Sequence, residues 1–168
     1  NQSRRQRQMC IRDSGRKYDI PVMVDWGSGS FIDMKAINIA EENPISIIMK
    51  NKPDLLTFSG DKLVGGPQAG IIVGKKILID LFQRNQLYRV LRIDKINLCF
   101  LEHTLRTYKS NYQHSDNLSI KLLTTSRSIL KNRARKIFKH QTNKKVKELG
   151  ISIVDTEVEA GSGSLPEN

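Results

Sequence analysis

Apolar residues along this chain fall into short runs that alternate with small and polar residues. The run from Ile20 to Asp25 ends in an acid, and its length and composition predict a buried parallel strand. Asp54 to Phe58 and Ile71 to Val73 predict two further strands, and residues 27–30 form a Gly/Ser loop directly after the first strand. Strands that alternate with loops and helices indicate an α/β layer fold.

Other segments carry apolar residues at the three- and four-residue spacing of a helix. The first such segment begins at Asn43, the expected cap, and directs Ile45, Ile48 and Met49 inward. Three later segments share this spacing: residues 75–82, 97–108 and 126–149. Residues 151–158 alternate in part between apolar and polar, which predicts a last strand.

The chain divides into three segments of different character. Residues 1–14 contain four arginines, one aspartate and no apolar period, so we interpret them as a non-native tail. Residues 15–110 hold most of the predicted strands, and residues 111–168 are mainly helical, with a polar stretch at 108–118 between them. Because no initiator methionine opens the chain, we expect it to be a truncated fragment.

Composition and charge narrow the classes of function. The chain is 38% hydrophobic and 27% charged, and no run approaches the roughly 20 apolar residues of a membrane span, so we expect a soluble cytoplasmic protein. The formal net charge of +11 favours a polyanionic partner, although solubility alone would also account for it. The two cysteines and three histidines lack metal-ligand spacing, which predicts no metal site.

Two residues suited to cofactor chemistry come after predicted strands. Asp25 ends the first strand, and Lys62 comes soon after the second, behind Ser59 and Asp61. Ligands of open α/β sheets bind at the carboxyl ends of strands. A lysine amine can form an imine with the aldehyde of pyridoxal phosphate, and an aspartate beside the pyridine nitrogen keeps that ring protonated. Ser59 is a candidate donor to the cofactor phosphate, and Gly residues after Lys62 allow close backbone approach.

Each of these residues also has an ordinary interpretation. A lysine after a Gly-rich turn is usually a solvated surface residue, and Asp61 could simply pair with Lys62 there. An aspartate at a strand end often caps a turn. Spacing by itself therefore leaves the cofactor site and the plain surface loop both open.

A longer pattern favours the cofactor site. Residues 58–74, FSGDKLVGGPQAGIIVG, closely resemble the cofactor-lysine motif of the L-seryl-tRNA(Sec) selenium transferases, the bacterial selenocysteine synthases. Residues 21–33 resemble the strand and Gly/Ser loop of that family, and residues 87–105 resemble a later segment. Residues 161–166, GSGSLP, resemble a piece near its C-terminal domain. Trp26 departs from the leucine expected there.

The resemblance implies a pyridoxal-phosphate enzyme of fold type I, the aspartate-aminotransferase type. Residues 15–110 would then be the C-terminal part of the large cofactor-binding domain, and residues 111–168 the start of the small C-terminal domain. The implied reaction converts L-seryl-tRNA(Sec) into L-selenocysteinyl-tRNA(Sec) with selenophosphate, by β-elimination and replacement. The implied assembly is a cytoplasmic homo-oligomer with active sites between subunits.

The resemblance also assigns roles to individual residues. Lys62 corresponds to the lysine that binds the cofactor covalently, and Asp25 to the acid near the pyridine nitrogen. Asp61 matches an acid that assists proton movement beside the lysine. Arg89 and Arg92 fall on arginines that bind anions at the active site, and guanidinium groups suit phosphate or selenophosphate.

Two other functions stay open at this point. Another pyridoxal-phosphate lyase or transferase, acting on a small amino acid, would share Lys62 and Asp25. A non-catalytic tRNA-binding module would instead depend on the basic segment from Arg127 to Lys147, which has nine Lys or Arg residues and no acid. That segment fits either contact with an RNA backbone or a helix whose charged face is merely solvated.

Overall fold

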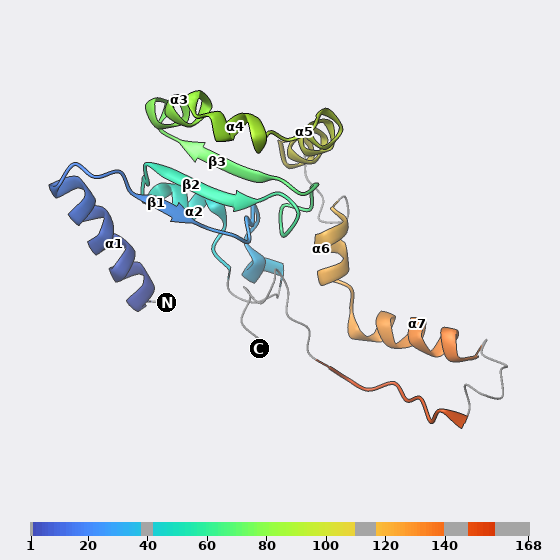
Figure 1. Cartoon of the computed structure of the whole chain (residues 1–168). Helices are drawn as coiled ribbons and strands as arrows, with labels where there is room; N and C mark the ends of the chain where they lie inside the picture. Colours follow the sequence, from blue (N-terminus) through green and yellow to red (C-terminus); the bar gives the residue numbers. More distant parts are fainter. Residues whose placement is uncertain (1, 38–41, 110–116, 140–147, 157–168) are drawn as a thin grey trace.

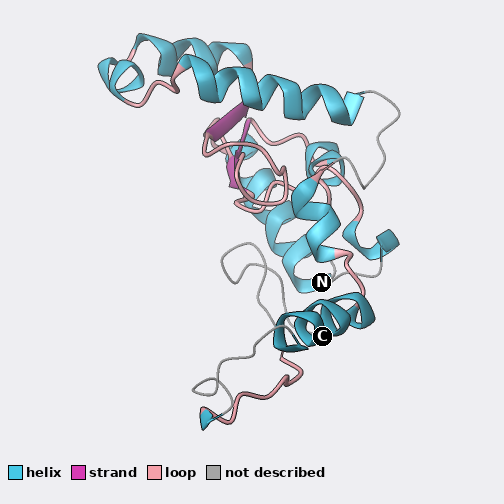
Figure 2. Cartoon of the chain, turned by 90° about the vertical axis from the view of Figure 1, so that its right-hand side faces the viewer, coloured by secondary structure: helices cyan, strands magenta, loops and turns pink. Residues whose placement is uncertain are grey.

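A three-stranded sheet lies at the centre of the structure, a computed structural model that describes residues 2–37, 42–109, 117–139 and 148–156 (Figure 1). Figure 2 shows helices on both sides of the strands. In chain order the elements are α1 (Gln2–Lys17), β1 (Met23–Asp25), the 3-10 helix η1 (Met34–Ile37), α2 (Ile45–Lys50), β2 (Leu55–Ser59), β3 (Gly70–Gly74), α3 (Lys76–Arg84), α4 (Gln86–Val90), α5 (Lys95–Lys109), α6 (Leu118–Leu123) and α7 (Arg127–Lys139).

All three strands expected within residues 20–73 are present, in the order β1-β2-β3. β1 is parallel to β2, as predicted for the first strand, and β3 is antiparallel to β2. The prediction of a buried first strand was wrong, because Met23 and Asp25 are exposed and only Val24 is half-buried. β1 is an edge strand of this sheet, and α2 covers one face of it, so its alternate side chains face outward.

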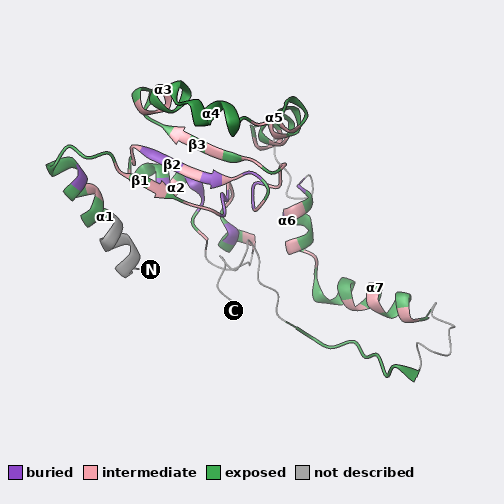
Figure 3. Ribbon diagram, viewed as in Figure 1, coloured by how far each residue is buried: buried purple, intermediate pink, exposed green. Residues whose placement is uncertain are grey.

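The core lies between β2 and α2. Leu56 and Phe58 of β2 are buried against Ile45 and Ile48 of α2, together with Val64 from the loop after β2 (Figure 3). Ile45 and Ile48 therefore face inward as predicted. Hydrophobic side chains at alternate strand positions and at helical spacing can share one core only if the strand and helix pack face to face.

The start of α2 differs from the expectation. Met49 is 38% exposed, so its predicted inward direction was wrong. Asn43 is not the cap either: Pro44 occupies that position, without a side-chain hydrogen bond to the helix. The backbone carbonyl of Asn43 instead accepts a hydrogen bond from the indole Nε1 of Trp26, at 3.1 Å. The helix therefore begins one residue later than local propensity predicts, and Asn43 makes a tertiary contact through its backbone instead.

The remaining predictions of secondary structure succeed in part. Segments 75–82 and 97–108 correspond to α3 and α5, and segment 126–149 corresponds to α7 up to Lys139, beyond which residues 140–147 lie outside the described part. Residues 151–156 form no strand, so the described part of that prediction was wrong. The segment lies beside α7, to which Asp155 is ion-paired, and a strand needs a neighbouring strand to satisfy its backbone.

Four elements lack a counterpart in the sequence predictions: α1, η1, α4 and α6. Helix α1 includes most of residues 1–14, and Arg12 donates a hydrogen bond to the carbonyl of Asn51 at 3.3 Å. The non-native origin of residues 1–14 stays a prediction.

No helix in the described part of the chain is long and apolar enough to cross a membrane.

Candidate active site

The parallel pairing of β1 with β2 brings the two predicted cofactor segments to one edge of the sheet. Asp25, the last residue of β1, pairs with Thr57 of β2. Their side chains share a face, and the Thr57 hydroxyl donates a hydrogen bond to Oδ1 of Asp25 at 3.0 Å. Ser59, two residues further along β2, lies on this same face and is half-buried.

Backbone hydrogen bonds continue the pairing beyond the ends of the strands, so that the loop after β1 runs beside the loop after β2. Three bonds make this connection: Trp26 N to Thr57 O at 2.8 Å, Ser59 N to Gly27 O at 3.3 Å, and Leu63 N to Ser28 O at 3.1 Å. The last of them anchors the residue directly after Lys62. The predicted Gly/Ser loop therefore lies alongside the segment that carries the candidate lysine, to which it is hydrogen-bonded.

Lys62 is half-buried, and its amine lies over Gly27. A Cβ atom built on Gly27 would be 3.6 Å from Nζ of Lys62, so the amine reaches the backbone two residues beyond Asp25. The structure thus gathers Lys62, Asp25 and Ser59 at a single sheet edge. Asp61 precedes Lys62 with its side chain exposed.

A tight turn presents Lys62. The Gly65 amide donates to the carbonyl of Lys62 at 3.0 Å, and the Gly66 amide donates to the carbonyl of Gly60 at 2.8 Å. Gly65 has a φ of 72°, a left-handed conformation that favours glycine. These glycines serve the turn itself, whereas close approach to a cofactor, the reason that the sequence suggested, stays a prediction.

Arg89 and Arg92 lie elsewhere. Arg89 is on α4 and Arg92 comes just after it, and both side chains are exposed. Among the described contacts, no hydrogen bond or ion pair joins either guanidinium group to Lys62 or Asp25. Within this one chain the structure does not bring the predicted anion-binding arginines to the candidate lysine.

Two residues near the lysine turn were not predicted from the sequence. Asn117 is 5% exposed, and its Nδ2 donates to the carbonyl of Val64 at 2.8 Å. The Tyr108 hydroxyl donates to the same carbonyl at 2.9 Å. The only sequence signal was an Asn directly before an apolar helical segment, which indicates a cap, and Asn117 does cap α6.

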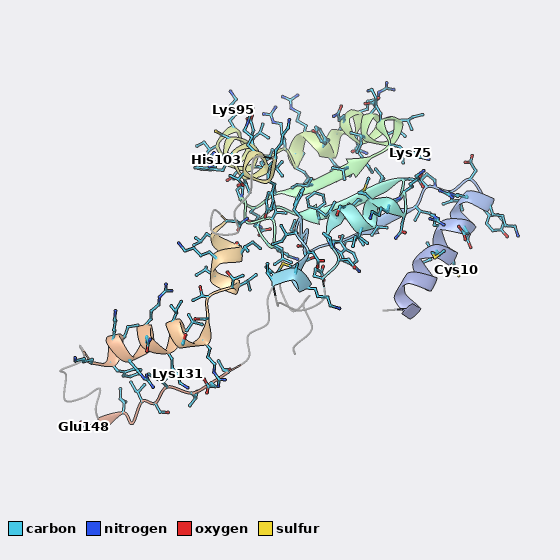
Figure 4. The ribbon with its side chains drawn as sticks, turned by 180° about the vertical axis from the view of Figure 1, so that it is seen from behind. Cys10, Lys75, Lys95, His103, Lys131 and Glu148 are labelled. Carbon is cyan, nitrogen blue, oxygen red and sulfur yellow. The ribbon has the colours of Figure 1, made fainter. Side chains whose placement is uncertain are left out.

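The other end of β1 is held by Asp54. One carboxylate oxygen accepts a hydrogen bond from the Val22 amide at 2.7 Å, and the other lies 2.5 Å from Nζ of Lys75 (Figure 4 labels Lys75). The hydrogen bond from Lys75 and then that from Val22 lower the pKa of Asp54 below its ordinary value. This cluster fixes the N-terminal end of β1 against β2 and β3, opposite the end that carries Asp25.

The described residues hold no group of three or more His, Cys, Asp or Glu side chains placed to bind a metal ion. Cys10 on α1 and His103 on α5, for example, lie on separate parts of the molecule (Figure 4). Both cysteines are free and exposed.

Comparison with known proteins gives one consistent result. The sequence profile of the family described as L-seryl-tRNA selenium transferase matches residues 5–168. The chain belongs to this family. It is 45% identical over 154 residues to the L-seryl-tRNA(Sec) selenium transferase of Caldanaerobacter subterraneus subsp. tengcongensis, a match that covers 91% of the chain and 33% of the relative.

Other relatives of the same name agree. The protein of Clostridium botulinum strain Loch Maree is 40% identical over 153 residues (90% of the chain, 33% of the relative), and that of Desulfotalea psychrophila is 38% identical over 154 residues (91% and 33%). The chain spans about one third of the length of these relatives. The family resemblance carried by the lysine motif is confirmed.

The residues at the sheet edge fit the cofactor of pyridoxal-phosphate enzymes. A primary amine that is only half-buried lies over a glycine, which leaves no side chain beside it at that point. An exposed carboxylate stands at the end of the neighbouring parallel strand, positioned by a threonine hydroxyl. Amine and carboxylate are the two groups that this cofactor requires, one for its aldehyde and one for its ring nitrogen.

Proposed function

We propose that this chain forms part of the active site of an enzyme that converts L-seryl-tRNA(Sec) into L-selenocysteinyl-tRNA(Sec) with pyridoxal phosphate and selenophosphate. The observation that carries the proposal is the position of the Lys62 amine over Gly27, two residues after Asp25 at the end of the parallel strand β1, in a chain of the selenium transferase family. The names of the relatives supply the selenium transfer and the seryl-tRNA.

Pyridoxal phosphate, when bound, supplies an electron sink that allows an amino acid to lose its α-proton and its β-hydroxyl group. Lys62 would hold the cofactor through its aldehyde, and its amine would serve as the base that takes the α-proton. Asp25, to which the Thr57 hydroxyl donates a hydrogen bond, would keep the pyridine nitrogen of the cofactor protonated. Ser59 would donate a hydrogen bond to the cofactor phosphate, and the exposed Asp61 would assist proton movement beside the lysine.

Arg89 and Arg92 bind the selenophosphate anion in this proposal, because guanidinium groups pair well with phosphate oxygens. Both are exposed and neither contacts Lys62 in the described part of this chain, so a second copy of the protein would have to bring them to the site. We therefore propose a homo-oligomer with active sites between subunits. The mixed α/β core fits a fold type I enzyme, with residues 15–110 in the large domain and residues 111–168 in the small one.

The tRNA partner suits the charge of the chain, which is +11. Helix α7 contributes Arg127, Lys131, Arg135 and Lys139, which are four residues apart and so share one face. We propose that this face contacts the phosphate backbone of the tRNA. A tRNA substrate is in turn the reason to propose a cytoplasmic enzyme.

The assignment of Lys62 is tested by trapping its bond to the cofactor. The chain replaces the matching third of the Caldanaerobacter relative, and the full-length chimera is incubated with pyridoxal phosphate, reduced with borohydride and digested. We expect mass spectrometry to find the pyridoxyl group on Lys62. Lys62→Ala should abolish both the label and the visible absorption band, whereas Lys95→Ala, at an exposed site on α5, should retain them.

The same chimera separates the candidate functions. Conversion of seryl-tRNA(Sec) that requires selenophosphate supports the proposal. Turnover of free serine without tRNA would favour a lyase or transferase for small amino acids. Binding of tRNA without any uptake of pyridoxal phosphate would favour the RNA-binding module and would overturn the proposal.

A further inference from the structure

The turn that presents Lys62 is held from behind by residues far along the chain. The carbonyl of Val64, two residues after the lysine, accepts hydrogen bonds from Nδ2 of Asn117 at 2.8 Å and from the hydroxyl of Tyr108 at 2.9 Å. Tyr108 is also 3.3 Å from the carbonyl of Leu63, and Nδ2 of Asn117 donates to the Tyr108 hydroxyl at 2.8 Å. The turn and two later helices therefore share one closed network.

Burial makes this network costly to break. Val64 is fully buried and Asn117 is 5% exposed, so a carbonyl or amide that lost its partner there would lack water to replace it. The left-handed Gly65 comes directly after Val64, and a Cβ atom at that position would collide with the Asn117 side chain. The turn and Asn117 thus fit each other in shape as well as in hydrogen bonding.

Tyr108 connects the turn to the loop after Asp25 as well. Its ring stacks on Phe31 with centroids 4.9 Å apart, and Phe31 in turn meets Phe58 of β2 edge-on at 5.9 Å. Phe31 comes directly after the Gly/Ser loop that runs beside the lysine turn. One side chain therefore braces both loops that carry the candidate cofactor residues.

We propose that Asn117 and Tyr108 are positioning residues, which hold the Lys62 turn through the carbonyls of Leu63 and Val64 and so fix the lysine amine over Gly27. The inference rests on the proposed function of Lys62. Neither side chain touches the amine in the described contacts, so their effect acts through the turn. The network also makes the helices after the strands part of the lysine's support, because Asn117 opens α6 and Tyr108 lies on α5.

Asn117 also has a second role, and the test must distinguish this role from its support of the Lys62 turn. Its Oδ1 accepts a hydrogen bond from the Ile120 amide at 3.2 Å and caps α6. Asn117→Asp keeps an oxygen for this cap and removes the amide that donates to Val64 and Tyr108. Tyr108→Phe removes only the hydroxyl and leaves the ring on Phe31. The matched controls are Asn132→Asp, at an exposed site on α7, and Tyr18→Phe, at an exposed site after α1.

The first measurement needs no cofactor. Hydrogen exchange of the chimera without pyridoxal phosphate should show the amides of Leu63, Gly65 and Gly66 exchanging about tenfold faster in Asn117→Asp and in Tyr108→Phe. The Ile120 amide should keep its protection in Asn117→Asp, and the controls should match the parent. Unchanged exchange in the turn would overturn the proposal.

The second measurement records the rate at which Lys62 binds pyridoxal phosphate, read from the visible band. We expect both variants to bind about tenfold to a hundredfold more slowly at temperatures where they stay folded, because displacement of a reacting group by about 1 Å can cost that much. A normal rate beside faster exchange would overturn the positioning role. If the parent itself forms no bond to the cofactor while the exchange results hold, the proposed function fails and the support of the turn stands.

Discussion

At the residue scale, single side chains decide how the ends of the short strand β1 are held. Asp54 satisfies the Val22 amide and pairs with Lys75, while Thr57 positions Asp25 at the opposite end. A three-residue strand makes few ladder hydrogen bonds, so these side-chain contacts contribute much of its register. The candidate site therefore depends on a residue such as Asp54 that takes no part in its chemistry.

Asp54→Asn tests this dependence through pH. Because the folded state lowers the pKa of Asp54, the ionised carboxylate stabilises the fold above its ordinary pKa near 3.8, and this stabilisation is lost as the pH falls through the lowered pKa. We expect the variant to lose about 1 kcal/mol at pH 7 and to match the parent in strong acid. Urea unfolding of the 168-residue chain in dilute solution, monitored by the fluorescence of Trp26, measures the difference in the free energy of unfolding. An equal loss at both pH values would contradict the ion pair's role.

Gly65→Ala tests the turn after Lys62. The residue has a φ of 72° and its Cβ would meet Asn117, so we expect a loss of about 1–3 kcal/mol in the free energy of unfolding. Gly70→Ala is the control, because a Cβ on Gly70 meets nothing within 4 Å. Equal stability of the two variants in urea unfolding would show that the turn tolerates a side chain.

At the element scale, helix α7 combines a basic face with an acidic partner. Asp155 accepts a hydrogen bond from Nε of Arg127 at 2.8 Å and lies 3.5 Å from Nζ of Lys131, whose place on α7 is labelled in Figure 4. The hydrogen bond from Arg127 lowers the pKa of Asp155. Arg135 and Lys139 continue the same face, and Asp155 pairs with neither of them, so in the described contacts this carboxylate does not offset the positive charge of that half of the helix.

The double variant Arg135→Gln, Lys139→Gln should therefore weaken tRNA binding by the chimera. If each side chain neutralises one phosphate, the slope of log K against log salt should fall by about 2. Arg16→Gln with Lys17→Gln, an equal change of charge at the end of α1, should leave the slope unaltered. Filter binding across a salt series makes the measurement, and identical slopes for the two pairs would show that α7 is merely solvated.

At the scale of the whole molecule, the described chain leaves much apolar surface uncovered. Val90 and Leu91 are 78% and 80% exposed, and Ile77 is 70% exposed (Figure 3 shows α3 and α4 mostly green). On the face of the sheet that carries Asp25, Met23 and Ile72 are exposed as well, whereas Leu55 is buried. The three strands and the helices that pack on them therefore do not enclose a complete hydrophobic core.

The isolated 168-residue chain should consequently be inactive and prone to self-association. Light scattering after size-exclusion chromatography should show mass increasing with concentration, because contact between exposed apolar faces removes them from water. The chimera, in which the rest of the relative is present, should elute at a constant size. A monomeric chain with a cooperative melting transition at high concentration would contradict this expectation.

The sequence by itself determined the three strands, the main helices and the family, because alternation, helical spacing and a long collinear motif are local properties. The same local motif and strand pattern are the basis for predicting Lys62 and Asp25 as site residues, and those roles stay predictions. The tertiary structure alone decided that β3 runs antiparallel, that residues 151–156 lie along α7, and that Tyr108 and Asn117 reach the turn 44 and 53 residues away. Strand register and side-chain packing depend on contacts between segments that are distant in the sequence, and local periodicity does not specify those contacts.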